Sequence, residues 1–175
     1  MNTQLILSTL FKQNEVRYDQ LWDDLLKLSQ KSFNQPFEPD NLSIADHLMM
    51  VLGELRRWIG FIEGERDNQP SEPPLGQNQD LVQLHNQWSL IFSDISGLIH
   101  QEKTIDLNQS MEGIQGPIWE VLVHMMMVAE EHHHYIVTIL AQMGVLERPQ
   151  RSNRDLWQFQ TESLPDVRSQ RTISC

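Results

Sequence analysis

The sequence has a single cysteine among its 175 residues, Cys175, and this residue stands last in the chain. An intrachain disulfide is therefore excluded, and so is a zinc site built from four cysteines. Basic residues are also scarce, because 13 lysines and arginines against 24 aspartates and glutamates give a formal net charge of −11. Nucleic acids and anionic membranes attract basic surfaces, so we expect neither of them as a partner.

Long apolar runs are missing as well. No stretch approaches the roughly 18 consecutive apolar residues of a transmembrane helix. Residues 1–10 lack the basic segment and apolar core of a secretory signal. With the single cysteine, these absences lead us to expect a cytoplasmic protein. The sequence also lacks a glycine-rich phosphate loop, a Gly-x-Ser-x-Gly elbow and an aspartate-rich calcium loop, so these motifs indicate no enzyme class.

What the sequence does contain is helical periodicity. Apolar residues recur every three or four positions in four segments, 3–31, 43–64, 80–102 and 117–144, with breaks rich in proline, glycine or polar residues between them. No segment alternates with the period of a strand. The sequence therefore predicts an all-α protein, a single domain over 1–160. Its expected architecture is an antiparallel four-helix bundle, connected up-down-up-down or with a longer crossover. Residues 161–175 are polar, and we expect a disordered tail there.

The segment 117–144 has the clearest boundaries. Pro117 suits the first helical position, and Gly144 can adopt the left-handed conformation that ends a helix. The apolar stripe between them includes one titratable residue, His132. A buried imidazole needs a polar partner, and a metal ion is one such partner.

Other histidines are predicted to point inward from their helices. His47 lies one step from the apolar stripe of 43–64, and His85 lies on the inner face of 80–102. Metal sites in helical bundles commonly take imidazoles from facing helices, so His47 and His132 are candidate metal ligands. The alternative, which spacing alone favours, is that both are core histidines with hydrogen-bond partners.

Ligand pairs four residues apart share one face of a helix. Glu120 with His124, and Glu130 with His134, have this spacing. Helical rotation turns Glu130 and His134 largely away from the apolar stripe, so we rank them below His132.

Two segments resemble a known family. The first runs from Ser43-Ile44-Ala45-Asp46-His47-Leu48 to Arg57-Trp58-Ile59, and the second from Leu122-Val123-His124 through His132 to Gly144. They are similar to the second and fourth helices of the DinB/YfiT-like superfamily of bacterial helix bundles. The fourth helix of that family has the form L-x-H-x-x-x-H-x-x-x-H-R-G-Q.

The resemblance implies a divalent metal ion, such as zinc, nickel, iron or manganese, held by His47 and His132. The family's middle ligand falls on Val128, which cannot bind a metal. Members of the family include metal-dependent thiol S-transferases that use bacillithiol or mycothiol, and a maleylpyruvate isomerase. The resemblance thus implies a small-molecule or low-molecular-weight thiol substrate. Homodimerisation through exposed helix faces is a further expectation.

Three hypotheses follow. The first is an active metal-dependent thiol S-transferase or hydrolase-like enzyme. The second is a helix bundle of the same type whose metal site is weakened or lost, and the valine at 128 favours it. The third is a module that binds a small ligand in an apolar interior around Trp58, Trp88 and Met125.

Overall fold

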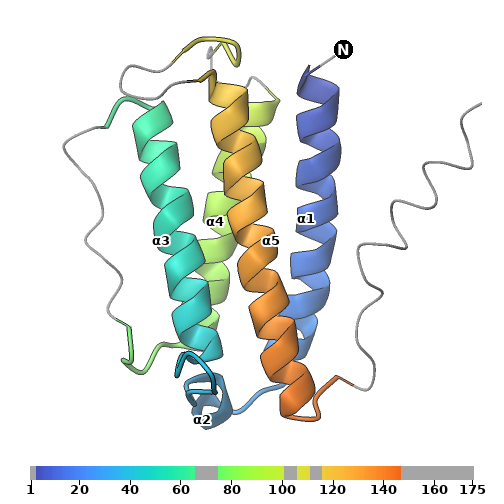
Figure 1. Ribbon diagram of the computed structural model, residues 1–175, viewed down its shortest axis with the longest axis vertical. Coiled ribbons are helices and arrows are strands. Elements are labelled where there is room, and N and C mark those ends of the chain that lie inside the picture. The colour runs from blue at the N-terminus through green and yellow to red at the C-terminus, as the bar shows by residue number, and fades with distance from the viewer. Residues whose placement is uncertain (1–2, 66–74, 101–105, 111–115, 147–175) are drawn as a thin grey trace, which may run out of the picture.

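A computed structural model describes residues 3–65, 75–100, 106–110 and 116–146 (Figure 1). Within these ranges the regular structure is entirely helical: α1 (Thr3–Leu25), α2 (Gln30–Phe33), α3 (Ile44–Ile62), α4 (Leu81–Ile99) and α5 (Ile118–Gln142). The predicted all-α class is therefore confirmed for the described residues. The predicted domain boundary near residue 160 and the tail 161–175 lie outside them.

The first predicted helix, 3–31, is too long. Helix α1 ends at Leu25, and the short helix α2 begins after Ser29. The Ser29 side chain accepts a hydrogen bond from the backbone N–H of Ser32, as an N-cap does. The apolar periodicity continues across this break, which is why the sequence pattern did not reveal it.

Helix α3 begins at a complete capping box. The Ser43 hydroxyl accepts the Asp46 backbone N–H at 3.1 Å, and the Asp46 carboxylate accepts the Ser43 backbone N–H at 2.9 Å. The same carboxylate accepts the backbone N–H of Gly76 at 2.7 Å. The first turn of α3 is therefore held both to its own cap and to the chain that leads into α4.

The longest helix, α5, keeps close to its predicted bounds. Pro117 occupies the N-cap position, one residue before the helix, and Gly144 has a φ of 70° just after its end. The Val145 backbone N–H then reaches back to the Leu140 carbonyl at 3.0 Å, which closes the helix in a Schellman motif.

The four long helices pack around one core. Helix α1 packs against α4 and α5, and α3 packs against the same two helices. The Gln4 side chain donates to the Ile99 carbonyl, so α1 and α4 run in opposite directions. The bond between Gly76 and Asp46 places the start of α4 beside the start of α3, so these two helices run in the same direction (Figure 1). Of the two predicted connectivities, the chain thus adopts the longer crossover.

Aromatic rings fill the core between α1 and α4. Tyr18 stacks on Trp88 with ring centroids 3.8 Å apart, and Trp88 packs against Phe92 at 4.3 Å. Trp58 instead contacts Phe61 and His124 near the surface. The two tryptophans therefore have separate neighbours, and the predicted ligand-binding interior around Trp58, Trp88 and Met125 gains no support. None of the described helices has the length and apolarity that a membrane span requires.

Candidate functional site

The structure brings together the two histidines that the sequence singles out. His47 lies in the first turn of α3, where its backbone N–H bonds the Ser43 carbonyl at 3.1 Å. His132 faces it from α5, and the two Nδ1 atoms are 3.3 Å apart. The capping box fixes the backbone of His47, so this ring has a defined position at the interface between α3 and α5.

The two rings differ in their exposure to solvent. The His47 side chain is 3% exposed, whereas His132 is half-buried at the edge of the interface. Tyr135 stacks on the His47 ring almost in parallel, at an interplanar angle of 8° and a centroid distance of 5.2 Å. The Tyr135 ring is 44% exposed, so it covers the buried imidazole from the solvent side.

A carboxylate lies behind the buried ring. The Oδ2 atom of Asp40 is 3.4 Å from the Nε2 atom of His47. This Nε2 atom is buried and makes no hydrogen bond with any described residue, so Asp40 is its nearest described polar partner. In the tautomer that carries its proton on Nε2, the side nearer the Asp40 carboxylate, the lone pair of Nδ1 is directed toward His132.

The electrostatics keep both rings neutral. Burial lowers the pKa of His47, and the charges of Asp40 and Asp46 oppose this effect only in part. Burial also lowers the pKa of His132, and the nearby His47 lowers it further, against the opposing charges of Glu131 and Glu54. Neutral imidazoles are the forms that bind metal ions, so both rings are in a ligating state near neutral pH.

The geometry can be compared with what a metal ion requires. A tetrahedral zinc ion with bonds of about 2.0–2.1 Å to two imidazoles places their nitrogens roughly 3.3–3.4 Å apart. The observed 3.3 Å between the Nδ1 atoms of His47 and His132 matches this spacing. A third ligand is missing, however, because the described residues contain no group of three or more histidine, cysteine, aspartate or glutamate side chains suited to a metal.

The family resemblance implies a third ligand at residue 128. Val128 lies one helical turn before His132 on α5, half-buried against the core. Its side chain has no donor atom, so the described site offers two ligands from His47 and His132 and none from this position. Water or substrate would have to complete the coordination of an ion.

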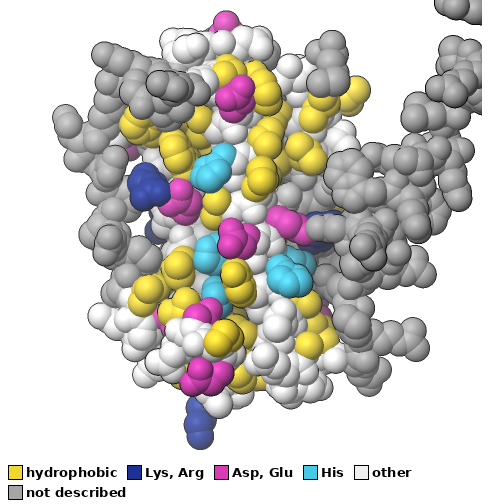
Figure 2. Space-filling model, viewed as in Figure 1, with side chains coloured by type: hydrophobic (Ala, Val, Ile, Leu, Met, Phe, Trp, Pro, Cys, Tyr) yellow, Lys and Arg dark blue, Asp and Glu magenta, His cyan; other side chains and the backbone are white. Residues whose placement is uncertain are grey.

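A second polar cluster lies farther along the same pair of helices. The indole N–H of Trp58 donates to Glu54 at 2.6 Å, Arg57 pairs with the same carboxylate, and His124 packs edge-on against Trp58. Burial alone would raise the pKa of Glu54, but the bonds from Arg57 and Trp58 outweigh it and lower that pKa. Figure 2 shows histidines and carboxylates together on the face formed by α3 and α5.

The structure corrects the position of the core histidine. We expected His132 in the apolar stripe of α5, but His133 is the buried residue, with 5% exposure. Its ring packs edge-on against Tyr18 of α1 with centroids 5.3 Å apart, and burial lowers its pKa. At about 100° per residue, the two histidines lie on opposite sides of the centre of the buried face. His133 therefore faces α1, while His132 faces α3.

The sequence does carry a signal that His133 is a core residue. It lies four residues after Ala129 and three before Ile136, and both of these are buried. This spacing is that of a core position on a helix.

The remaining candidates lie apart from the pair. His85 is half-buried against Trp22, with ring centroids 4.8 Å apart. Glu130 forms an ion pair with Arg17 of α1, and His134 is exposed. His85 does not contribute to the arrangement around His47, and neither do Glu130 and His134, the two residues four apart on α5.

Comparisons of the chain with protein-family models, with curated proteins and with solved structures give no match.

Proposed function

We propose that this chain is a helix-bundle protein of the DinB/YfiT-like type, whose His47–His132 pair forms a weakened site for one divalent cation. The observation that carries the proposal is the 3.3 Å separation of the two Nδ1 atoms across the interface of α3 and α5. The order of the four long helices and the positions of both histidines agree with the resemblance to this family.

Three features favour a shared ion over a simple hydrogen bond between the rings. The N···N distance of 3.3 Å lies at the long end of hydrogen-bond distances. Asp40 stands behind His47 in the place of the carboxylate that orients many metal-binding histidines. The lowered pKa values of His47 and His132 keep both lone pairs available.

Two imidazoles leave open positions on an ion, which when bound would supply Lewis acidity to a water or thiol. Zinc, nickel and iron suit imidazole ligands better than manganese does. With Val128 in place of a third ligand, binding is expected to be weak. An active thiol S-transferase would need a further donor, so we rank that activity, its thiol substrate and homodimerisation below the weakened site.

The second candidate is a bundle without metal, in which His132 donates a hydrogen bond to His47. The same 3.3 Å contact supports it, because this distance still lies within hydrogen-bond range. In this case the pair only joins α3 to α5, and the protein acts as a non-catalytic module.

Metal analysis separates these two functions. Untagged protein purified without chelator is titrated with zinc, nickel and manganese, and the bound metal is measured by elemental analysis and calorimetry. We expect saturation near one ion per chain, lost in His47→Ala and in His132→Ala but kept in His134→Ala, whose side chain is exposed. Absence of binding for all three metals, or metal binding in His47→Ala and His132→Ala that equals that of the parent protein, would reject the metal site and leave the hydrogen-bonded pair.

A further inference from the structure

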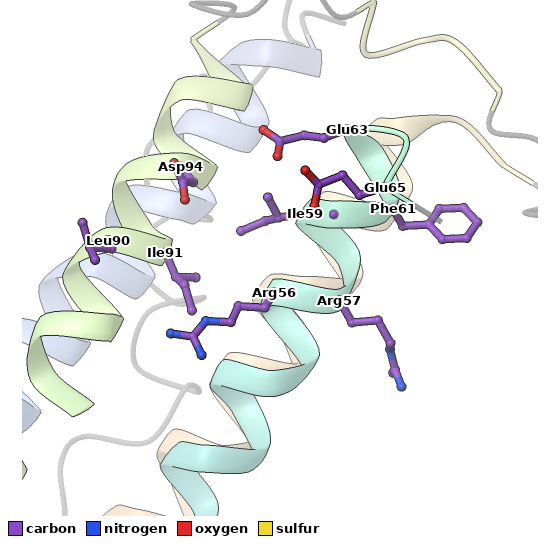
Figure 3. Close-up of a pocket in the computed structure, with 10 residues that line it drawn as sticks. Arg56, Arg57, Ile59, Phe61, Glu63, Glu65, Leu90, Ile91 and Asp94 are labelled. Atoms are coloured by element: carbon purple, nitrogen blue, oxygen red, sulfur yellow. The ribbon is translucent and has the colours of Figure 1, made fainter. Parts of the chain in front are cut away.

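A groove of about 390 Å³ lies between α3 and α4, and Arg56 is the first residue of α3 that lines it (Figure 3). His47 precedes Arg56 by nine residues, which is roughly 13 Å along a helix axis. Among the residues that the structure describes, the lining of this groove does not include His47. Access to the buried imidazole is instead decided by the side chains that contact it.

The side chains of His132, Asp40 and Tyr135 surround the His47 ring. The Nδ1 atom of His132 lies 3.3 Å from its Nδ1 atom, and the Oδ2 atom of Asp40 lies 3.4 Å from its Nε2 atom. Tyr135 lies over a face of the ring, parallel to it within 8° and with the two centroids 5.2 Å apart. The nitrogen edges of the imidazole therefore have polar neighbours, while an aromatic ring covers one of its faces.

Helix α5 presents Tyr135 and His132 to the same neighbour. Residues three apart lie on one side of a helix, and the ring centroids of these two residues are 6.4 Å apart. The next residue along the chain, Ile136, is fully buried in the core. The backbone that carries Tyr135 is therefore anchored, so the ring can leave His47 only by rotation of its own side chain.

The parts of this arrangement differ in their freedom to move. The His47 backbone is fixed in the first turn of α3, where its N–H bonds the Ser43 carbonyl at 3.1 Å. Tyr135 is 44% exposed, and exposed side chains change rotamer within picoseconds to nanoseconds. Its parallel, offset stacking on the imidazole is a favourable aromatic geometry, which opposes this movement. Tyr135 is thus a movable cover over a fixed ring.

We propose that Tyr135 is a gate that controls how fast solutes reach the His47 imidazole. The gate is closed when the two rings are stacked, and it opens when the Tyr135 side chain rotates toward solvent. For metal ions this inference rests on the proposed cation site, whereas for access to the ring itself it does not. The stack is the same with and without an ion, so the gate slows binding and release by one factor and leaves the affinity unchanged.

The first test needs no metal. The full chain in EDTA is treated with diethyl pyrocarbonate, which acylates neutral imidazole nitrogens, and peptide mass spectrometry measures the rate at each histidine. We expect His47 to react more slowly than the exposed His100, and the ratio of the two rates to rise about fivefold in Tyr135→Ala. Alanine is a strong helix former, so this variant keeps the fold. An unchanged ratio would overturn the gate.

Two control variants separate the covering ring from a general loosening of α5. Tyr135→Phe keeps the aromatic ring and should keep the parental ratio of rates. Met127→Ala removes another exposed side chain of the same helix, with 66% exposure, and should also keep that ratio. A rise in either control as large as that in Tyr135→Ala would show that the ring of Tyr135 is not the cover.

Stopped-flow mixing with zinc and a chromophoric chelator then measures binding and release. Tyr135→Ala should raise both rate constants about fivefold and leave their ratio, the Kd, unchanged. A weaker Kd at an unchanged association rate would overturn the gate and assign Tyr135 to the positioning of His47. Zinc binding that is absent from the parent protein would reject the cation site alone, because the acylation rates still decide whether Tyr135 controls access.

Discussion

The Nδ1 atoms of His47 and His132 lie 3.3 Å apart across the interface of α3 and α5, although the two residues are 85 positions apart in the chain. The antiparallel packing of these helices places the first turn of α3 beside the C-terminal half of α5. The pair is therefore a product of the helix directions, and not of any local motif. In the proposed metal site, His47 and His132 supply two side-chain ligands and Val128 supplies none.

Val128→His should strengthen divalent-metal binding. The residue lies one turn before His132 on the same helix, so a histidine there adds a third imidazole on the side of the pair. We expect a gain of at least about tenfold in zinc affinity, equivalent to roughly 1.4 kcal/mol. Calorimetric titration of the variant and the parent protein measures this change.

The matched control for that substitution is Val137→His. Val137 is also a half-buried valine on α5, but it lies five residues after His132 and is rotated by about 140° from it. An equal gain in both variants would mean that any added histidine recruits metal. No gain in Val128→His would mean that His47 and His132 do not form part of a metal site.

The stability of the fold should fall with mild acidification. The pKa values of His47 and His132 are lowered from their ordinary 6.5 in the folded protein, so the unfolded chain binds protons first as the pH falls. The free energy of unfolding is then constant above about pH 6.5 and decreases as the pH falls through and below this value. Urea unfolding at a series of pH values measures this slope.

His133 contributes to acid sensitivity with the same sign, because burial lowers its pKa too. The variants His47→Gln and His133→Gln should each reduce the slope between neutral and mildly acidic pH. A slope that is the same in these two variants as in the parent protein would show that the buried rings of His47 and His133 do not titrate differently in the folded and unfolded states.

Periodicity predicted the long helices well because each one buries a single continuous stripe. It did not show which of a helix's two neighbours each buried residue faces. Helix α5 packs against both α1 and α3, so its buried face is wide. Within the histidine run, His133 faces α1 and His132 faces α3. The spacing of the apolar residues does not distinguish the histidine that faces Tyr18, His133, from the one that faces His47, His132. The position of Asp40 was also hidden, because it precedes α3 in a loop whose course no periodic pattern reports.

Ser43→Ala should destabilise the protein and loosen the histidine pair. The Ser43 side chain caps α3 and also donates to the Asp46 carboxylate at 2.6 Å, and all of these groups are buried. Loss of an N-cap costs about 1 kcal/mol, and the partners left unsatisfied add to this cost. Urea unfolding measures the effect. Asp80→Ala removes the cap of α4, a helix that carries neither histidine of the pair, and provides a comparison.

The two cap variants should differ in their effect on metal binding. Only Ser43→Ala disturbs the first turn of α3, which holds His47, so only this variant should weaken zinc binding. Equal zinc affinities in Ser43→Ala and Asp80→Ala would show that the cap stabilises the helix without positioning the imidazole.

Tyr18→Phe should destabilise the core without changing metal binding. The Tyr18 hydroxyl donates to the Ala129 carbonyl at 2.6 Å, and burial raises the pKa of Tyr18 well above its usual value, so the hydroxyl stays protonated. Phenylalanine keeps the stacking on Trp88 but leaves the buried carbonyl without this donor. We expect a loss of about 1–2 kcal/mol in the free energy of unfolding. Because Tyr18 joins α1 to α5 on the side opposite the pair, zinc affinity should be unchanged. A variant with parental stability would mean that the carbonyl finds another partner, and a parallel loss of zinc binding would mean that the α1–α5 contact also sets the position of His132.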